Sequence, residues 1–490
     1  MHDAYLLGLD LGTTNAKAAV YDQRGTLIVE SSVSYPTTYP QTGYAEQRPS
    51  DWRTALTVAC RQVMAALGEQ RRNLIGMALA AHGPGLVLLD AQGQPLLDSS
   101  PTWQDTRCLA QAQHLLTVAG PYPTGMGLPY NTFLAKLLWA CEQQPELVQR
   151  ARFALGIKDY LVHWLTGQFL TEPSTNAGAD VWPQAAVVAC GWSVDRLAQV
   201  VPSTRVIGPL LPMRARELDL PAHLPVVIGL NDGASATFSM GALEPHELVL
   251  TLATSGVLRV VLDQPMADQT RLDHKLFAWP YVPGRAIAGG HLRLGASALK
   301  WFAETHCSGQ PEDELAAVLV EAANSPPGSR GVIFLPYLLG RGGRHADDGT
   351  QGAFLNLTLA HTRADLGRAI LEGVAFAFRE LLDDFAEMGY RPPLIRISGG
   401  GAQSVLWRQI LADVLACPLA YFPADSTLGA AMMAAVGFGL YADCAAAVVA
   451  MVRPPEMTYP QVQTQRNYAA AYQAYQQLRD RLCANVAQTV

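Results

Sequence analysis

The sequence LGLDLGTTNAKAAVYD (7–22) decides the fold, because a similar stretch, LVLTLATSGVLRVVLD (248–263), follows later in the chain. The two stretches align without a gap at an offset of 241, which is 248 minus 7. Thr13 then matches Thr254, and the final aspartates match as well. Each copy predicts two apolar strands joined by a loop of small and hydroxyl-bearing residues. We therefore expect an internal duplication: two similar α/β halves whose hairpin loops face a shared cleft.

Further strands and helices are expected around each hairpin, from runs of apolar residues and from apolar residues at helical spacing. In the first half, strands are expected at 4–10, 16–21, 26–32, 73–81 and 85–90, a helix capped by Ser50 before the fourth, and a helical region over 105–170. In the second half, helices are expected at 296–306, 312–324, 363–388, 426–441 and 467–483, and strands at 331–335 and 394–397. The domains are expected to be 1–244 and 245–490.

Composition narrows the class of protein. A chain of 490 residues at roughly 100–200 residues per domain predicts two or three domains. Its net charge of −7 argues against nucleic acid as a partner. If such an acidic protein binds phosphate groups, backbone N–H groups and a divalent cation must supply the positive charge. The eight cysteines are scattered without a C-x-x-C pair, which predicts reduced thiols and a cytoplasmic protein. No membrane partner is expected, since no apolar run approaches about 18 residues.

The two hairpin loops are candidate phosphate sites. Their Gly, Thr and Ser residues offer clustered N–H and hydroxyl donors and allow close approach. The first strand carries Asp10 where the second copy has Thr251, which predicts a metal ion on one side only. The alternative is that Asp10 merely ends a strand and accepts a hydrogen bond from its own turn.

A second glycine-rich segment, SGGGAQS (398–404), follows an expected strand and precedes a helix. Bare backbone there allows a flat ring to lie against it, and the helix N-terminus adds positive potential. Gly295 is a weaker candidate for the opposite wall. The alternative for both is a tight structural turn.

Asp232 lies in IGLNDGASA (228–236), between an expected strand and a helix of small residues. Phosphoryl transfer to a hydroxyl needs a general base within hydrogen-bond reach, and Asp232 is our candidate. An acid at this place is also a strong helix N-cap, which is the alternative.

Two further segments carry side chains suited to a polyol. His82 lies in AAHGPGLVLLD (80–90), and Trp103 and Asp105 lie in TWQDTRC (102–108). An imidazole, an indole and an acid bind hydroxyls by hydrogen bonds and cover C–H faces. All three could instead be structural, with Asp105 capping a helix or pairing with Arg107.

These motifs together resemble a known family. GLDLGTTN alone resembles the first phosphate loop of Hsp70 chaperones, whereas the chain from about 5 to 441 resembles the FGGY carbohydrate kinases, which include glycerol kinase, xylulokinase and gluconokinase. The segments that carry the resemblance are DLGTT (10–14), AEQRPSDW (45–52), AHG (81–83), WQDTR (103–107), NDGASA (231–236), LATSGV (252–257), the long run 335–376 and SGGGAQS (398–404).

The resemblance implies a fold and a set of roles. The fold would be two RNase H-like, actin-like α/β domains hinged around a central cleft, with ATP and Mg²⁺ mainly on the C-terminal half. Asp232 would be the base, and Asp10 would act near the metal. The implied sugar contacts are Ala81, His82, Gly83, Trp103, Asp105 and Asn231. The implied ATP contacts are Thr13, Thr14, Asn15, Lys17, Thr254, Ser255, Gly256, Gly295, Gly400, Gly401 and Ala402.

The implied activity is transfer of the γ-phosphoryl group of ATP to a terminal hydroxyl of a ketopentose, first of all xylulose. L-xylulose and gluconate are the alternatives, because Ala81 stands where xylulokinases have Met. Ala253 also replaces the first Gly of the second loop, and 340–348 departs from the family pattern. The other classes are an actin- or Hsp70-type nucleotide switch and an inactive sugar sensor. Because members of this family are often dimers, the resemblance is compatible with a homodimer.

Overall fold

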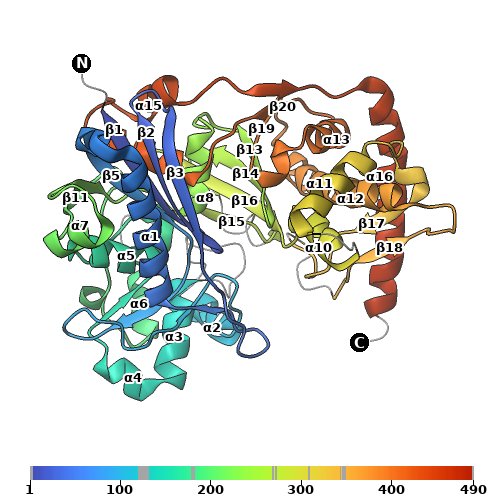
Figure 1. Ribbon diagram of the computed structural model, residues 1–490. Coiled ribbons are helices and arrows are strands. Elements are labelled where there is room, and N and C mark those ends of the chain that lie inside the picture. Colours follow the sequence, from blue (N-terminus) through green and yellow to red (C-terminus); the bar gives the residue numbers. More distant parts are fainter. Residues whose placement is uncertain are drawn as a thin grey trace.

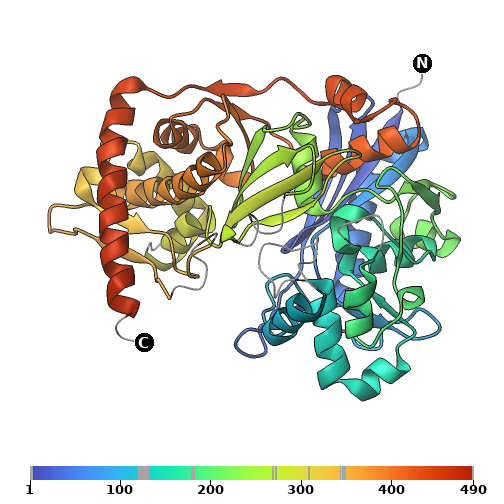
Figure 2. The same ribbon diagram turned by 180° about the vertical axis from the view of Figure 1, so that it is seen from behind.

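The computed structural model describes residues 4–119, 132–177, 182–266, 270, 273–306, 310–342, 344 and 349–487. Two large β-sheets lie in the two halves of the chain, with helices packed against them (Figure 1; Figure 2). The last helix, α16 (Val462–Ala487), lies on the side of the second half that is remote from the first (Figure 1). Of the parts of the chain that the structure describes, no helix is both long enough and apolar enough to span a bilayer.

The first sheet has six strands. Strands β1, β2 and β3 are antiparallel, whereas β5 runs parallel to β1, and β12 parallel to β5. β1 is buried along its whole length, as expected for a central strand. In sheet order the strands are β11 (Val206–Pro209), β12 (Pro225–Val227), β5 (Leu74–Ala81), β1 (Tyr5–Leu11), β2 (Asn15–Asp22) and β3 (Leu27–Ser34). The helices of this half are α1 (Pro49–Leu67), α2 (Leu109–Ala119), α3 (Phe133–Gln143), α4 (Pro145–Arg150), α5 (Ile157–Thr166), α6 (Gln184–Ala189), α7 (Pro212–Leu218) and α8 (Asp232–Ser239).

The second sheet repeats the central arrangement of the first. Its strand order is β15 (Phe277–Pro280), β16 (Ala286–Leu292), β14 (Gly256–Leu262), β13 (Leu248–Leu252), β19 (Ile395–Ser398), β20 (Leu419–Tyr421) and β21 (Glu456–Thr458). The run β16-β14-β13-β19-β20 corresponds to β3-β2-β1-β5-β12, with the same parallel and antiparallel pairings at its centre. The two-domain α/β fold expected from the repeat is confirmed. The helices of this half are α10 (Ser297–His306), α11 (Pro311–Ala322), α12 (Arg363–Glu387), α13 (Val405–Leu415), α14 (Ser426–Gly437), α15 (Cys444–Met451) and α16.

The gap-free alignment of the two hairpins is wrong by one residue after the loop. Leu11 pairs with Ala16 across residues 12–15, whereas Leu252 pairs with Gly256 across the shorter loop 253–255. Val20 therefore corresponds to Val260, not to Val261. Side chains alternate between the faces of a strand, so only this register keeps the buried positions of both hairpins on equivalent faces.

The start of α1 also differs from the expectation. Helix α1 begins at Pro49, and no side chain caps it. Ser50 lies inside the first turn, where its hydroxyl donates to Asp98 Oδ2 at 2.7 Å. Proline serves as the start signal because its fixed φ suits the first helical position and its missing N–H is not needed there.

Helix α14 belongs to the second half of the chain but packs on the first sheet. A Cβ on Gly8 of β1 would lie 1.9 Å from the carbonyl oxygen of Thr427, and a Cβ on Gly429 would lie 2.0 Å from that of Ser235 in α8. Gly25 likewise lies against Met451, the last residue of α15. Figure 1 shows α15, in red, beside the blue strands β1–β3. The division at 244 stays a prediction, and residues 426–451 contact the N-terminal side of it.

Candidate active site

Three strand ends of the first sheet form the site. β1, β5 and the segment after β12 run parallel, so their carboxyl ends meet at one edge. The N–H of His82 donates to the carbonyl of Leu11 at 2.9 Å, and Ala81 forms a parallel bridge with Asn231. This edge, which we call the strand-end site, brings Asp10, His82 and Asp232 into one region.

Asp232 is the first residue of α8, and it is not the helix cap. Asn231 has that role, since its Oδ1 accepts from the N–H of Ala234 at 2.7 Å. The Asp232 carboxylate accepts from the N–H of Gly233 through Oδ1 at 2.7 Å. Burial raises the pKa of Asp232, against the lowering effects of that N–H and of the Arg259 charge. The alternative that Asp232 caps α8 is therefore wrong. Among the described residues, no side chain forms a hydrogen bond with Asp232 Oδ2.

Asp10 is the penultimate residue of β1 and is almost fully buried. Its Oδ2 accepts from the hydroxyl of Ser426 at 2.5 Å, while its Oδ1 is buried without a hydrogen-bond partner among the described residues. Burial first, and then the negative charge of Asp232, raise the pKa of Asp10 to about 8. The Ser426 hydroxyl belongs to α14, which is distant in sequence, so the idea that Asp10 serves only its own turn is wrong. A buried acid with one unpartnered oxygen, next to a second, partly buried acid, has the chemistry of a divalent-cation site.

Arg259 is a residue of this site that sequence reasoning missed. It lies in β14 and is buried, its Nη1 donates to Thr251 Oγ1 at 2.9 Å, and its Nε has no partner among the described residues. A Cβ on Gly233 would lie 3.1 Å from its Nη2, so the guanidinium lies over the first turn of α8. Burial lowers the pKa of Arg259 to about 10, opposed by Asp232. The only signal was one charge within the apolar run VLRVV (257–261).

The first hairpin loop is held by neighbouring side chains. The indole N–H of Trp103 donates to Thr13 Oγ1 at 2.8 Å, and Gln47 Nε2 donates to the Thr13 carbonyl at 2.7 Å. The motif predicts that Trp103 contacts the sugar, and the structure adds this contact with Thr13 of the first hairpin loop. Lys17 forms an ion pair with Asp425 at 2.8 Å. The main-chain carbonyl of Thr14 accepts from Tyr35, and that of Asn15 accepts from Gly12.

His82 is buried and neutral. Its Nε2 lies 3.1 Å from Gln47 Oε1, and its Nδ1 is buried without a partner among the described residues. Burial lowers the pKa of His82 to about 3, so the ring carries no charge near neutral pH. The neighbouring Gly83 has open space where a side chain would stand. A neutral ring nitrogen without a partner suits a hydrogen bond to a hydroxyl group.

Asp105 is fully buried and paired with Arg107. The Arg107 Nε donates to Asp105 Oδ1 at 2.8 Å, and the N–H of Ala45 donates to Asp105 Oδ2 at 2.8 Å. The pairing that the sequence left open is therefore present. Asn231 is similarly engaged, because its Nδ2 donates to the carbonyl of Ser174. Sugar contacts by Asp105 and Asn231 stay predictions.

The second loop and the glycine-rich segment pack together. The N–H of Gly295 donates to the Thr254 carbonyl at 2.9 Å, and the N–H of Ala253 donates to the Ser255 carbonyl at 3.0 Å. Ala253 does not have a positive φ, so its methyl group causes no backbone strain. Gly401 lies against Leu252, whereas Gly400 is exposed with nothing within 4 Å of a Cβ. Gly256 pairs with Leu252 at the start of β14, and Ala402 is buried, its N–H donating to Gly399.

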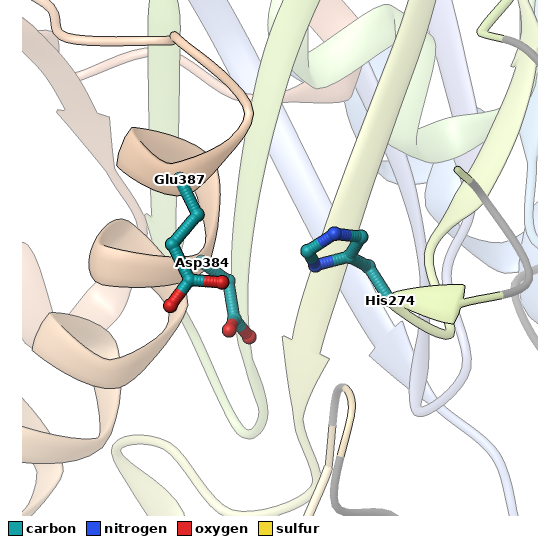
Figure 3. A group of neighbouring side chains, drawn as sticks. All are labelled: His274, Asp384 and Glu387. Atoms are coloured by element: carbon teal, nitrogen blue, oxygen red, sulfur yellow. The ribbon is translucent and has the colours of Figure 1, made fainter.

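A second cluster of possible metal ligands lies in the C-terminal half. Figure 3 shows His274 opposite Asp384 and Glu387, which project from the last turns of α12. Their ligand atoms lie within 4.8 Å of one another. The guanidinium of Arg344 contacts all three, with 2.8 Å to Glu387 and 3.3 Å to Asp384. Because an arginine already balances these acids, the cluster is an ion-pair network rather than a metal centre. Of the departing run 340–348, Gly343 and residues 345–348 lie outside the described residues.

The substitution Asp10→Asn tests whether the pKa of Asp10 is raised in the folded protein. In the metal-free protein the pKa of Asp10 is about 8, against 3.8 for the unperturbed group, so the folded state keeps a proton that the unfolded state loses. The wild type should therefore lose stability as the pH rises from about 4 to about 8, with an upper bound of about 1.4 kcal/mol for each pH unit in that range. The Asp10→Asn variant should lose less stability over the same pH range. Urea unfolding at pH 5 and pH 8 measures the difference, and equal pH dependence in both proteins would contradict it.

Comparisons with known proteins identify the family that this chain matches. Residues 5–239 match the model of the N-terminal domain of the FGGY family of carbohydrate kinases, and residues 248–438 match that of its C-terminal domain. A xylulose kinase of Lactococcus lactis subsp. lactis is 30% identical over 491 residues, 97% of this chain and 96% of that protein. A gluconokinase of Bacillus licheniformis is 27% identical over 462 residues, 90% of this chain and 88% of that protein.

Solved structures of sugar kinases share the fold of this chain. The xylulose kinase from Rhodospirillum rubrum superposes with a TM-score of 0.83 at 27% identity, covering 98% of this chain and 99% of that one. A gluconate kinase from Lactobacillus acidophilus has a TM-score of 0.84 at 23% identity over the whole of both chains, which shows the shared fold.

Proposed function

The chain belongs to the FGGY family of carbohydrate kinases and is an ATP-dependent sugar kinase, and we propose that its acceptor is a ketopentose, xylulose first, phosphorylated at a terminal hydroxyl. The observation that carries the proposal is the meeting of Asp10, His82 and Asp232 at the strand-end site. The xylulose kinases among the relatives support the choice of sugar.

Asp232 is the general base of the proposed reaction. Its carboxylate takes the proton of the acceptor hydroxyl as that oxygen bonds to the γ-phosphorus, and the bond from phosphorus to the ADP oxygen breaks. A positioned base contributes about 10²–10⁴-fold to such a step. Arg259 lies beside Asp232 and opposes the effect of burial, so it favours the ionised form that can accept a proton.

Asp10 fits a divalent cation. Its buried Oδ1 has no partner among the described residues, and its pKa is raised first by burial and then by the negative charge of Asp232. Mg²⁺ bound with ATP would supply charge neutralisation of the phosphates. Asp10 and the hydroxyl of Ser426 then orient the phosphate end of the site, and the donors of the first loop hold the phosphate oxygens.

The sugar lies in our proposal over Ala81, His82 and Gly83. The free Nδ1 of His82 meets a hydroxyl group, and the open space at Gly83 receives the carbon chain. Ala81, which is fully buried, stands where xylulokinases have Met. Trp103 links this side to the phosphate loop through Thr13.

The adenosine is proposed to lie on Gly400, with Gly401 and Ala402 below it and Gly295 as the other wall. Replacing Gly400 by Leu should raise the KM for ATP about tenfold or more, because the exposed backbone on which the ring lies would be covered. The KM for the sugar should stay within about twofold. Initial rates with each substrate varied in turn measure both constants. An unchanged KM for ATP would move the adenosine elsewhere.

A panel of acceptors identifies the sugar: D-xylulose, L-xylulose, D-ribulose, L-ribulose, gluconate, erythritol and glycerol. We expect the highest kcat/KM with D-xylulose and a phosphate ester at its terminal carbon, located by ³¹P–¹H NMR. Gluconate is the second candidate, because gluconokinases of similar identity are among the relatives. A higher kcat/KM for gluconate would replace xylulose as the acceptor and leave the kinase assignment intact.

A further inference from the structure

A buried network reaches the strand-end site from the helical part of the first half. It runs from Lys158 in α5 through Glu172 and Ser174 to Asn231, the residue that precedes Asp232. All four are more than nine-tenths buried. The sequence motifs give no role to the first three.

Ser174 holds Asn231 at two points. The N–H of Asn231 donates to Ser174 Oγ at 2.9 Å, and its side-chain Nδ2 donates to the Ser174 carbonyl. The remaining polar groups of Asn231 serve α8, since Oδ1 accepts from Ala234 and the main-chain carbonyl accepts from Ser235. The residue before Asp232 is therefore fixed on both sides.

Ser174 is itself held by a buried acid. Its N–H donates to Glu172 Oε2 at 2.8 Å, and its hydroxyl donates to Glu172 Oε1 at 2.8 Å. It lies in a short π-helical turn, Pro173–Ala177. Lys158 Nζ donates to Glu172 Oε1 at 2.9 Å and balances its charge.

The cost of burying this ion pair points to a purpose other than stability. Replacing a buried pair by apolar side chains is often neutral or stabilising, so such a pair is weak evidence for a stabilising role. Each charge here has its partner, and the chain of bonds ends at the first turn of α8. Resting on the proposed role of Asp232 as base, we propose that Ser174, braced by Glu172 and Lys158, is a positioning residue that sets the orientation of the Asp232 carboxylate.

The test replaces Ser174 by Ala and compares it with a matched change. Ser329→Ala is that control: Ser329 is buried, and its hydroxyl donates at 2.7 Å to Glu372, which is paired with Arg368 in a network that contains none of the site residues. Ser174→Ala should lower kcat about 10–10²-fold, since small displacements of a catalytic group cost that much. The KM for ATP should stay within about twofold. Ser329→Ala should keep kcat within about twofold at a similar loss of thermal stability.

A conservative variant separates positioning from loss of structure. Ser174→Thr keeps the hydroxyl and should recover most of kcat, whereas Glu172→Gln removes the charge that braces Ser174 and should lower kcat with the KM for ATP unchanged. If Ser174→Ala and Ser329→Ala have the same kcat while the wild type phosphorylates a sugar, the positioning role is wrong and the kinase assignment stands. If Ser174→Ala loses kcat and Ser174→Thr recovers none of it, the hydroxyl has no positioning role.

Discussion

Asp232→Asn should remove sugar phosphorylation while leaving the protein folded and able to bind ATP. The amide keeps the shape of the carboxylate and can accept the Gly233 N–H bond through its oxygen. It cannot take a proton from the acceptor hydroxyl, so kcat should fall about 10²–10⁴-fold. Initial rates of ADP formation with saturating sugar measure the loss, and calorimetric titration with ATP measures binding.

A surface aspartate provides the control for this substitution. Asp219→Asn makes the same chemical change at an exposed position that pairs with Arg71 at the surface. Its kcat should stay within about twofold of the wild type. If Asp232→Asn keeps most of its activity, the base is another group.

Of the substitutions proposed here, Gly8→Ala should destabilise the folded protein most. A Cβ at this position would lie 1.9 Å from the Thr427 carbonyl oxygen, so α14 must move away from β1. Overpacking of a buried contact costs about 1–3 kcal/mol, and collision with backbone belongs at the upper end. Activity should fall as well, because Ser426 in the same helical turn donates to Asp10. The midpoint of urea unfolding and kcat measure the two effects.

Gly400→Ala is the matched glycine control. Nothing lies within 4 Å of a Cβ at Gly400, and its φ is not positive, so its urea midpoint should match that of the wild type. A Gly8→Ala variant that is as stable as Gly400→Ala would mean that α14 does not rest closely on β1.

Much of the fold could be predicted from local pattern. The strands of both hairpins follow from apolar runs and from turn residues such as Gly25, which has a φ of 72°. The helices expected at 363–388 and 426–441 are present as 363–387 and 426–437. Asp10 could be singled out because it is an acid within an apolar strand, and Asp232 because it is an acid that follows a strand and starts a helix, where it can cap or act on a ligand.

The remaining features depend on contacts between distant segments. The one-residue difference between the loops is set by strand pairing, which a sequence alignment does not contain. Arg259 faces Asp232 only because β14 and α8 meet in three dimensions. Ser174 reaches Asn231 across 57 positions of sequence, and Ser426 reaches Asp10 across 416. The sequence motif predicts that Asp105 binds the sugar. Its pairing with Arg107 depends on the burial of Asp105 in the folded chain.

The sugar dependence of ATP turnover by the wild-type chain tests the central claim most directly. ADP formation is measured with Mg²⁺–ATP alone and then with each sugar of the panel. The account predicts that at least one sugar raises the rate by two orders of magnitude or more and appears as a phosphate ester in amounts equal to the ADP. ADP formation that no sugar changes, with phosphate released to water, would contradict it and favour a nucleotide switch.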